Sequence, residues 1–380
     1  MLRYLFIENT ENFKNIISNL KKSPFISIDT ESDSLYSYYE KLCLLQIASN
    51  ENIYLIDTLK VEISELKEIF ADKRIRKIFH SADSDMPLIK NLIEGEFNNI
   101  FDVMLAAKYC GIYRCGLANL IEKFFSVKLN KKYQKANWGY RPIMTEMLEY
   151  AAMDVYYLKN LKDILITELK KKNLFDEFLS HCEYITKITH KKYEFDPEGY
   201  FNINGFKYLN QRQISVFRNL YIKREEIAQK WDRPPFKIIS NEVMLKISQN
   251  PQEALNNLKS FKGISDYILQ KHSNWILQAI KDGLNSEIIN YEKKKKPYIL
   301  DKDITKTHEI FEKLRSWRQV VSKKRNLFPE LILNNEQLWK IARNRPQNHQ
   351  ELKSLNIPEF KIKIYEKEIL ELLSASKITN

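Results

Sequence analysis

Residues 25–31 read FISIDTE, an apolar run that ends in two acidic side chains two positions apart. β-Branched and aromatic residues in a run of this length, followed by a polar turn, predict a buried β-strand, Phe25–Asp29. Side chains at positions i and i+2 lie on the same face of a strand, so Asp29 and Glu31 are able to converge on one ion. An acid after a strand is more often a turn or helix-cap residue, so this pair alone does not identify a site.

Further short strands follow before the apolar spacing becomes helical. The expected strands are Lys41–Ala48, Asn52–Asp57 and Lys77–His80. Apolar residues at i, i+3 and i+4 then predict the helices Asp85–Ile93, Asp102–Cys110, Leu117–Phe125 and Glu146–Lys172. Three strands of hairpin type, a fourth strand and alternating helices predict an α/β or α+β domain with a mixed sheet over residues 1–195.

An internal repeat follows from residue 205 onward, where no strand is expected. Shifting residues 217–260 forward by 94 positions aligns them with residues 311–354 without a gap and gives 14 identities in 44 positions. The repeat predicts two related all-helical domains, joined near a charged run that ends in Pro. Their expected ranges are 205–287 and 300–376, with the joint at Tyr291–Pro297.

The net charge of +12 is unevenly distributed along the 380 residues. Residues 1–200 carry 28 Lys and Arg against 29 Asp and Glu, whereas residues 201–380 carry 33 against 20, a net charge of +13. This split indicates that the second part captures nucleic acid while the first performs chemistry; solvated, Lys-rich helices are the alternative. The candidate phosphate contacts are Lys223, Arg224, Lys230 and Arg233 in the first repeat, and Arg318, Lys323, Lys324 and Arg325 in the second.

Several classes of protein are excluded by the composition. No stretch reaches the roughly 20 apolar residues that a membrane-spanning helix needs, and the N-terminus becomes polar too early for a signal peptide. The four cysteines have no CxxC spacing, so neither a disulfide framework nor a thiolate zinc site is expected. A reducing cytoplasm, with no membrane contact, is the predicted location.

A third acid, Asp85, follows the strand Lys77–His80 at the start of a predicted helix. Helix N-termini favour Asp as a cap, so a structural role is the alternative. Asp83 lies two residues away and competes for the same role. The spacing from His80 and the apolar residues that follow favour Asp85 as the acid that faces inward, with Asp83 in the turn.

A fourth acid, Asp154, lies in the helix predicted over Glu146–Lys172, four residues after Tyr150 and on the same helix face. Its neighbours in the sequence are apolar, which indicates a position against the core. Burying an isolated charge is costly, so this carboxylate requires a partner, for which a metal ion is the best candidate. A buried tyrosine needs only a hydrogen bond, so Tyr150 alone is also compatible with an ordinary core position.

Taken in order, these acids resemble the DEDD superfamily of 3′-5′ exonucleases, in the subgroup that has Tyr in the third motif; IDTES, HSADSD and YAAMD match its three motifs. Three further stretches are similar to the ribonuclease D family, whose exonuclease domain precedes two helical domains of the HRDC type. They are FDVMLAAKY at 101–109, GLANLIEKFF at 116–125 and NWGYRP at 137–142. Asn137 departs from that family, which usually has Asp before the Trp. The resemblance implies a ribonuclease H-like α/β domain with a mixed sheet, followed by two all-α domains.

The resemblance also implies metal-dependent hydrolysis that releases nucleoside 5′-monophosphates from a 3′ end. In that scheme Asp29, Glu31 and Asp154 hold one ion, and Asp29 bridges to a second ion. Asp85 binds the second ion directly or through water, and Tyr150 orients the attacking water. Because the candidate ligands are carboxylates, Mg²⁺ or Mn²⁺ is expected rather than zinc, with two ions per active site.

RNA with a free 3′ end, chiefly tRNA precursors, is the substrate that the resemblance implies, and no obligate protein partner is expected. Leu35 and Tyr36 are candidates for stacking on the terminal base, and Trp138 and Arg141 for shaping the approach to the site; packing within the fold is the alternative for each. A DNA exonuclease of the same superfamily is the first alternative function, because carboxylates do not read the 2′-hydroxyl. A nonenzymatic nucleic-acid-binding protein with a decayed catalytic domain is the second, and the presence of all four acids and Tyr150 argues against it.

Overall fold

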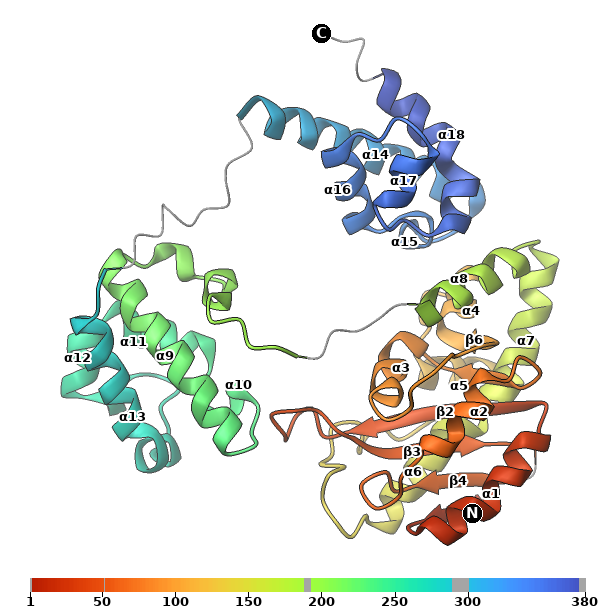
Figure 1. Ribbon diagram of the computed structural model, residues 1–380, viewed down its shortest axis with the longest axis horizontal. Helices are drawn as coiled ribbons and strands as arrows, with labels where there is room; N and C mark the ends of the chain where they lie inside the picture. The colour runs from red at the N-terminus through yellow and green to blue at the C-terminus, as the bar shows by residue number, and fades with distance from the viewer. Residues whose placement is uncertain (1, 51, 188–192, 289–300, 376–380) are drawn as a thin grey trace. The chain divides into compact units, whose positions relative to one another are not determined.

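The computed structural model of the chain contains two compact units (Figure 1). The first comprises Met1–Glu31, Leu42–His190 and Ile299–Asn380, and the second comprises Ser32–Lys41 and Lys191–Tyr298. The structure describes residues 2–50, 52–187, 193–288 and 301–375, with no side chains described for 301–303. The predicted joint at Tyr291–Pro297 therefore lies outside the described residues. Within them, no helix is long and apolar enough to cross a membrane.

A six-stranded mixed sheet forms the centre of the first unit. Its strands are β1 (Tyr4–Ile7), β2 (Phe25–Ser32), β3 (Leu42–Ala48), β4 (Ile53–Ile56), β5 (Arg76–Phe79) and β6 (Ile100–Asp102). Their order is β1-β4-β3-β2-β5-β6. β1 pairs in parallel with β4, β2 with β5, and β5 with β6, whereas β3 and β4 are antiparallel. The predicted mixed sheet is confirmed, with all four predicted strands in it.

Helices pack around this sheet, and their residues share one large hydrophobic core with it. They are α1 (Thr10–Lys22), α2 (Lys67–Ala71), α3 (Ala82–Lys90), α4 (Val103–Tyr109), α5 (Leu117–Phe125), α6 (Thr145–Tyr156), α7 (Leu158–Lys171) and α8 (Phe175–Lys187). The sequence analysis missed β1 and β6, because strands of four and three residues are too short for a period of two to be visible. It also missed α1, which begins after the side-chain cap of Asn9 on the Asn12 amide.

The single helix predicted over Glu146–Lys172 is wrong, because the chain forms two helices, α6 and α7. The break lies at Tyr157, whose ψ of −11° departs from the helical value. The Tyr157 ring stacks on Phe125 of α5 at 5.0 Å between centroids. Apolar spacing continues through the break and neither Gly nor Pro marks it, so the sequence alone shows one continuous helix.

Strand β2 changes character along its length. Its first four residues, Phe25–Ile28, are buried, and its last four, Asp29–Ser32, are partly exposed. The apolar half anchors the strand between β3 and β5 in the core. The acidic half therefore leaves the core on a fixed backbone, which places Asp29 and Glu31 at the rim of the sheet.

The two helical domains follow the sheet domain and confirm the all-α prediction. The first contains α9 (Gln211–Lys230), α10 (Pro235–Ile238), α11 (Asn241–Gln249), α12 (Pro251–Asn256) and α13 (Asp266–Asn285). The second contains α14 (Asp301–Arg325), α15 (Pro329–Ile332), α16 (Asn335–Asn344), α17 (His349–Ser354) and α18 (Glu359–Ala375). The starts of α10 and α15, and of α11 and α16, are separated by the 94 positions of the sequence repeat. Each domain has its own hydrophobic cluster.

Each helical domain buries an arginine at the same repeat position. Arg224 is 5% exposed and donates to a backbone carbonyl and, at 2.7 Å, to Asn241 Oδ1. Arg318 is 6% exposed and makes the same two kinds of bond, with Asn335 Oδ1 at 2.8 Å. The predicted phosphate contacts at Arg224 and Arg318 are therefore corrected: each guanidinium is bound inside its own domain and supports the fold.

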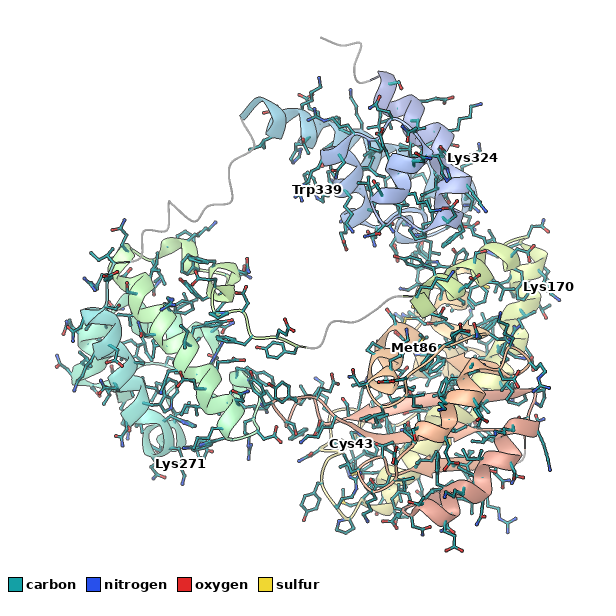
Figure 2. The ribbon with its side chains drawn as sticks, in the orientation of Figure 1. Cys43, Met86, Lys170, Lys271, Lys324 and Trp339 are labelled. Carbon is teal, nitrogen blue, oxygen red and sulfur yellow. The ribbon has the colours of Figure 1, made fainter. Side chains whose placement is uncertain are left out.

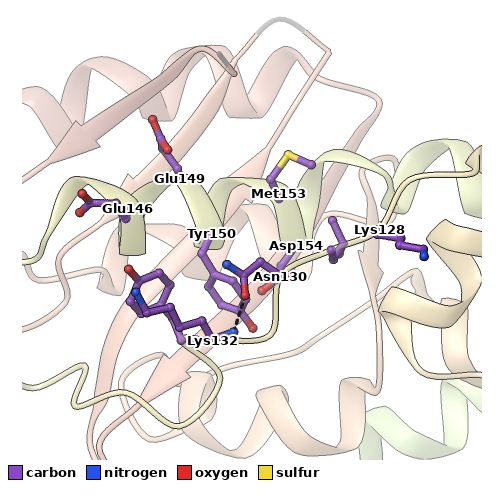
Figure 3. A pocket seen from close by; sticks show the side chains of 10 residues that line it. Lys128, Asn130, Lys132, Glu146, Glu149, Tyr150, Met153 and Asp154 are labelled. Atoms are coloured by element: carbon purple, nitrogen blue, oxygen red, sulfur yellow. Dashed lines mark hydrogen bonds between the residues drawn. The ribbon is translucent and has the colours of Figure 1, made fainter.

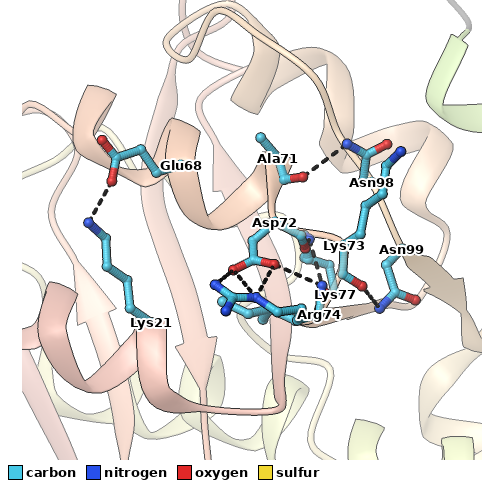
Figure 4. A network of polar contacts seen from close by, with 10 residues as sticks. Lys21, Glu68, Ala71, Asp72, Lys73, Arg74, Lys77, Asn98 and Asn99 are labelled. Atoms are coloured by element: carbon cyan, nitrogen blue, oxygen red, sulfur yellow. Dashed lines mark hydrogen bonds and ion pairs between the residues drawn. The ribbon is translucent and has the colours of Figure 1, made fainter.

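A polar network holds the N-terminal end of β5 (Figure 4). The Lys77 side chain is fully buried, and its ammonium group donates to the carbonyls of Asp72 at 2.6 Å and Ile75 at 2.9 Å. Burial lowers the Lys77 pKa to about 8. Arg74 pairs with the Asp72 carboxylate at 2.7 Å. These bonds fix β5 at the end opposite to the one from which the chain enters α3.

Trp138 and Arg141 also belong to the interior of the first unit. Trp138 is 1% exposed, and Arg141 binds both oxygens of the fully buried Asp57 carboxylate at 2.7 Å. The Arg141 guanidinium also donates to the carbonyls of Trp138, Tyr140 and Cys43. This arrangement corrects the predicted RNA contacts at Trp138 and Arg141, since both side chains anchor the loop before α6 to the sheet.

We expect Arg141→Met to lower the free energy of unfolding of the first unit by about 3–5 kcal/mol, because the Asp57 carboxylate remains buried without its partner. Hydrogen exchange of the β4 amides in the full chain measures this loss. Arg74→Met is the matched control, because its ion pair lies at the surface, with the Arg74 side chain 88% exposed. Equal protection of β4 in the wild type and Arg141→Met would contradict the anchoring role.

Candidate active site

Two elements of the first unit bring three acids together. β2 contributes Asp29 and Glu31, and α6 contributes Asp154. One carboxylate oxygen from each of the three lies within 4.8 Å of the others. The strand period of two places Asp29 and Glu31 on one face, and the core-facing side of α6 brings Asp154 to them. Asp154 is buried, as its apolar neighbours in the sequence predict.

The fourth acid, Asp85, lies near this cluster on the first turn of α3. It is buried, and Thr30, the residue between Asp29 and Glu31, donates its hydroxyl to Asp85 Oδ1. This bond ties α3 directly to the acidic end of β2. Asp83 is exposed and accepts a hydrogen bond from the Ser81 hydroxyl at 2.8 Å, so of the two competing acids only Asp85 faces the cluster.

The sequence analysis missed the residue that orients α3. Asp102, at the end of β6, is buried and accepts hydrogen bonds from the amides of Ser81, Ala82 and Leu105. Ser81 has a left-handed backbone with φ of 72°, which turns the chain sharply from β5 into α3. Asp102 thus caps the turn that aims Asp85. Asp102 lies in the FDVMLAAKY stretch at 101–109, but nothing in the sequence predicted its contact with residues 81 and 82.

Burial raises the pKa of every acid in this group, and repulsion by the other acids adds to it at Asp29 and Glu31. Burial, followed by the charges of Asp85, Asp154 and Glu31, raises the pKa of Asp29 well above its usual range. Burial and the charges of Asp154 and Asp85 raise the pKa of Glu31 to about 9. Burial also raises the pKa of Asp85 and of Asp154 to about 7. Without added positive charge, the cluster therefore holds protons that isolated carboxylates would release at neutral pH.

Tyr150 lies one helical turn before Asp154, and its hydroxyl donates to the Asp154 carboxylate. Burial and the nearby acids raise the Tyr150 pKa, so the phenol stays protonated and remains a donor. The Tyr150 ring contacts two other aromatic residues, with centroids 6.1 Å from Tyr133 and 6.2 Å from Trp138. The buried Trp138 thus packs beside the proposed water-orienting residue, which is the structural role of the NWGYRP stretch.

Tyr150 and Asp154 line two neighbouring cavities. One, of about 380 Å³, is lined by Asp29, Glu31, Asp154, Tyr150 and Lys131, among others. The other, of about 430 Å³, adjoins Tyr150 and Asp154 on α6 and is lined by Lys128 and Lys132 (Figure 3). The basic segment Lys128–Lys132 was not predicted as part of the site. The positive charge of this segment does not show in the nearly neutral net charge of the first 200 residues. Its lysines also have no regular spacing that would predict a site.

The remaining predicted RNA contacts lie in several places. Leu35 and Tyr36 lie on the loop Ser32–Lys41 of the second unit. Arg325 is paired with Glu177 of α8 at 2.5 Å and also binds Tyr365, which corrects its prediction as a free phosphate contact. Lys324 extends from the surface (Figure 2). The other predicted contacts that remain exposed are Lys223, Lys230, Arg233 and Lys323.

The carboxylate cluster fits a hard divalent cation. Mg²⁺ and Mn²⁺ prefer oxygen ligands, and the three closest donor groups here are all carboxylates. Buried like charges repel, and a cation relieves that repulsion. Asp29, Glu31 and Asp154 are therefore able to hold a divalent ion, with Asp85 next to them through Thr30.

We expect Mn²⁺ to stabilise the protein at pH 8 and to have little effect at pH 5. The folded-state pKa values of the acids lie above their unfolded values, so the metal-free protein loses stability as pH rises from about 4 toward 9. A cation at a hundred times its Kd adds about 2.7 kcal/mol to the free energy of unfolding. Thermal denaturation with EDTA or Mn²⁺ at the two pH values measures both effects.

In the same assay, Asp154→Asn should be more stable than the wild type in EDTA at pH 8 and should gain less from Mn²⁺, because one repelling charge and one ligand are gone. Asp83→Asn is the matched control, since Asp83 is exposed on the same turn of α3. A gain from Mn²⁺ in Asp154→Asn as large as that of the wild type would remove Asp154 from the cation site.

Comparison with known proteins identifies the domains. Residues 4–170 match the family model described as 3′-5′ exonuclease, and residues 213–280 and 307–373 match the HRDC domain model. A ribonuclease D of Desulfotalea psychrophila is 28% identical over 291 residues, which cover 75% of this chain and 76% of that protein. The exosome complex exonuclease RRP6 of Saccharomyces cerevisiae is 27% identical over 300 residues, 74% of this chain and 41% of the yeast protein.

The chain thus spans less than half the length of the yeast relative that it matches, but about three quarters of the bacterial ribonuclease D. The crystal structure of Escherichia coli RNase D superimposes with a TM-score of 0.69 at 23% identity, over 98% of this chain and 99% of that chain, which shows a shared fold. An exonuclease domain, two HRDC domains after it and ribonuclease D relatives lead to one conclusion: residues 4–170 form a domain that matches the 3′-5′ exonuclease family, two HRDC domains follow it, and the chain as a whole is similar to ribonuclease D.

Proposed function

We propose that this protein is a metal-dependent 3′-5′ exoribonuclease that trims the 3′ ends of small stable RNAs, chiefly tRNA precursors, and releases nucleoside 5′-monophosphates. The observation that carries the proposal is the cluster of Asp29, Glu31 and Asp154, whose carboxylate oxygens lie within 4.8 Å of one another beside Tyr150. Ribonuclease D relatives support RNA as the substrate class. The solved E. coli relative is described as an exoribonuclease involved in structured RNA processing.

The residues of the site divide the work of phosphodiester hydrolysis. Asp29, Glu31 and Asp154 would hold two Mg²⁺ or Mn²⁺ ions together with Asp85, and Asp29 would contribute to both. When bound, such ions supply Lewis acidity to the attacking and leaving oxygens of an in-line displacement. Tyr150 keeps its proton, so it would orient the attacking water through a hydrogen bond rather than act as a base.

Positive charge beside the acids favours the approach of an RNA end. Lys128, Lys131 and Lys132 line the two cavities that contain Tyr150 and Asp154. Lysine side chains bind phosphate without reading sequence, so they position the backbone and leave base preference slight. The exposed basic residues of the two HRDC domains would hold the body of the RNA, since residues 201–380, which contain both domains, carry a net charge of +13.

The proposal includes the setting in which the protein acts. Its four cysteines are free thiols, which suits a reducing cytoplasm. The yeast relative is named as part of an exosome complex, whereas the bacterial relatives of this length are named ribonuclease D. We infer that this chain needs no obligate protein partner and that RNA with a free 3′ end is its binding partner.

Digestion of a 5′-labelled tRNA transcript with a 3′ extension tests the function directly. We expect products that shorten by single nucleotides and stop near the mature end, with nucleoside 5′-monophosphates released from the start. Activity should require Mg²⁺ or Mn²⁺, disappear in EDTA, and fall to near background in Asp154→Asn while RNA binding persists. Internal fragments, nucleoside 3′-monophosphates, or faster digestion of a matched DNA strand would contradict the proposal, and the last result would favour a DNA exonuclease.

We expect Tyr150→Phe to slow cleavage about 10²–10⁴-fold, the usual contribution of a positioned proton-handling group, while Mn²⁺ affinity changes little. The substitution deletes only the hydroxyl that donates to Asp154 and leaves the ring packed beside Trp138. Single-turnover rates with saturating RNA measure the chemical step. Tyr133→Phe is the matched control, a neighbouring tyrosine in the same cavity. Equal rates for Tyr150→Phe and the wild type would leave Tyr150 with a packing role only.

A further inference from the structure

The loop Ser32–Lys41 begins one residue after Glu31 and returns to the sheet at Leu42, the start of β3. It belongs to the same compact unit as the first HRDC domain. The loop is folded on its own buried acid, Asp33, whose carboxylate accepts from the Lys41 amide at 2.8 Å and from the Ser37 hydroxyl at 2.6 Å. The segment that leaves the acidic strand is therefore an ordered loop.

Two carboxylates of the first HRDC domain bind this loop. Glu225 of α9 accepts from the Tyr38 hydroxyl at 2.5 Å and from the Tyr193 hydroxyl at 2.8 Å. Asp232, just beyond α9, accepts from the Tyr38 amide at 3.0 Å and pairs with the Lys41 ammonium group at 2.9 Å. Four hydrogen bonds, three of them from the loop, thus converge on two acids. Bonds to ionised acceptors are about twice as strong as neutral ones.

The second HRDC domain serves as an internal control for these two acids. The repeat places Gln319 at the position of Glu225 and Asn326 at the position of Asp232. Asp232 and Asn326 both follow the first helix of their domain with a left-handed backbone, φ 46° and 50°, so the two positions are structurally equivalent. The HRDC fold therefore does not need a carboxylate at either position.

The burial of the side chain at the Glu225 position also differs between the two HRDC domains. Glu225 is 4% exposed, whereas Gln319 is exposed. This position faces outward in the HRDC fold, and Glu225 is buried because Tyr38 and Tyr193 cover it. A buried carboxylate is retained only where donors compensate for lost hydration. Glu225 thus serves the contact with the loop and not the core of its own domain, in contrast to Arg224 next to it.

We propose that Glu225 and Asp232 are positioning residues, through which the first HRDC domain holds the loop Ser32–Lys41 so that Leu35 and Tyr36 are presented to the 3′-terminal base of RNA. This inference rests on the proposed function. Leu35 is an exposed apolar side chain on this loop, and Lys237 of α10 lies 6.0 Å from the centre of the Tyr36 ring. The catalytic acids are outside the loop, so the contacts of Glu225 and Asp232 with the loop affect substrate binding and not the chemical step.

Hydrogen exchange of the full chain without RNA tests the hold itself. We expect Glu225→Ala to speed exchange of the amides of residues 33–41 at least tenfold, with Tyr38→Phe acting in the same direction. Gln319→Ala, the same change at the equivalent position of the second domain, should leave this loop unchanged. The pair Glu225→Gln and Asp232→Asn, which gives the first domain the amides that the second carries, should have an intermediate effect. Unchanged exchange in Glu225→Ala would overturn the proposal.

Steady-state kinetics on a short RNA test whether the held loop improves binding of the 3′-terminal base. We expect Glu225→Ala to raise KM about tenfold, within the range that base stacking supplies, with kcat within twofold of the wild type. With an RNA whose 3′-terminal nucleotide lacks its base, the KM values of wild type and Glu225→Ala should coincide. Faster exchange of the loop amides in Glu225→Ala together with an unchanged KM would overturn the positioning role. Absence of trimming by the wild type would instead overturn the proposed function, and the exchange result would still report whether α9 holds the loop.

Discussion

Repulsion among carboxylates gathered at the end of β2 is the constraint on which the rest of the site depends. The strand places Asp29 and Glu31 on one face, and α6 adds Asp154 within 4.8 Å. Burial, together with this repulsion, raises the pKa values of Asp29 and Glu31, so the ionised cluster is unfavourable without a cation. Neighbouring groups restrain it: the Thr30 hydroxyl holds Asp85, and the Tyr150 hydroxyl holds Asp154. The surrounding fold keeps the acids together, so that a divalent ion meets a preorganised set of ligands.

The two HRDC domains show how one fold can be adapted by a few surface residues. Both bury an arginine against an asparagine at matching positions, Arg224 with Asn241 and Arg318 with Asn335. In each pair the asparagine gives the buried guanidinium an acceptor that it needs away from water. The first domain has carboxylates at the positions of Glu225 and Asp232, where the second has Gln319 and Asn326. Among the residues that the structure describes, the loop Ser32–Lys41 supplies hydrogen-bond donors to these two carboxylates. Comparison of the two repeats therefore distinguishes the residues that the HRDC fold requires from those that the contact with the loop requires.

Charge counting was informative at the scale of domains and misleading at the scale of residues. The net +13 of residues 201–380 correctly marked a part of the chain that differs from the first. The same count could not distinguish the buried Arg224 and Arg318 from the exposed Lys323 and Lys324. It also concealed the lysines at 128, 131 and 132, which lie beside the acids within a region of nearly neutral charge.

The sequence by itself determined the mixed sheet and the helical repeat, and it singled out Asp29, Glu31, Asp85, Tyr150 and Asp154 as candidate site residues. Each of these depends on local periodicity, on ordered motifs or on an ungapped internal repeat, all of which can be read along the chain. Only the tertiary structure decided that Asp102 aims α3, that Tyr157 divides one apolar run into two helices, and that Glu225 holds a loop 187 residues away. Such contacts join residues far apart in the chain, and their donors and acceptors leave no periodic signal because they meet only after the core has packed.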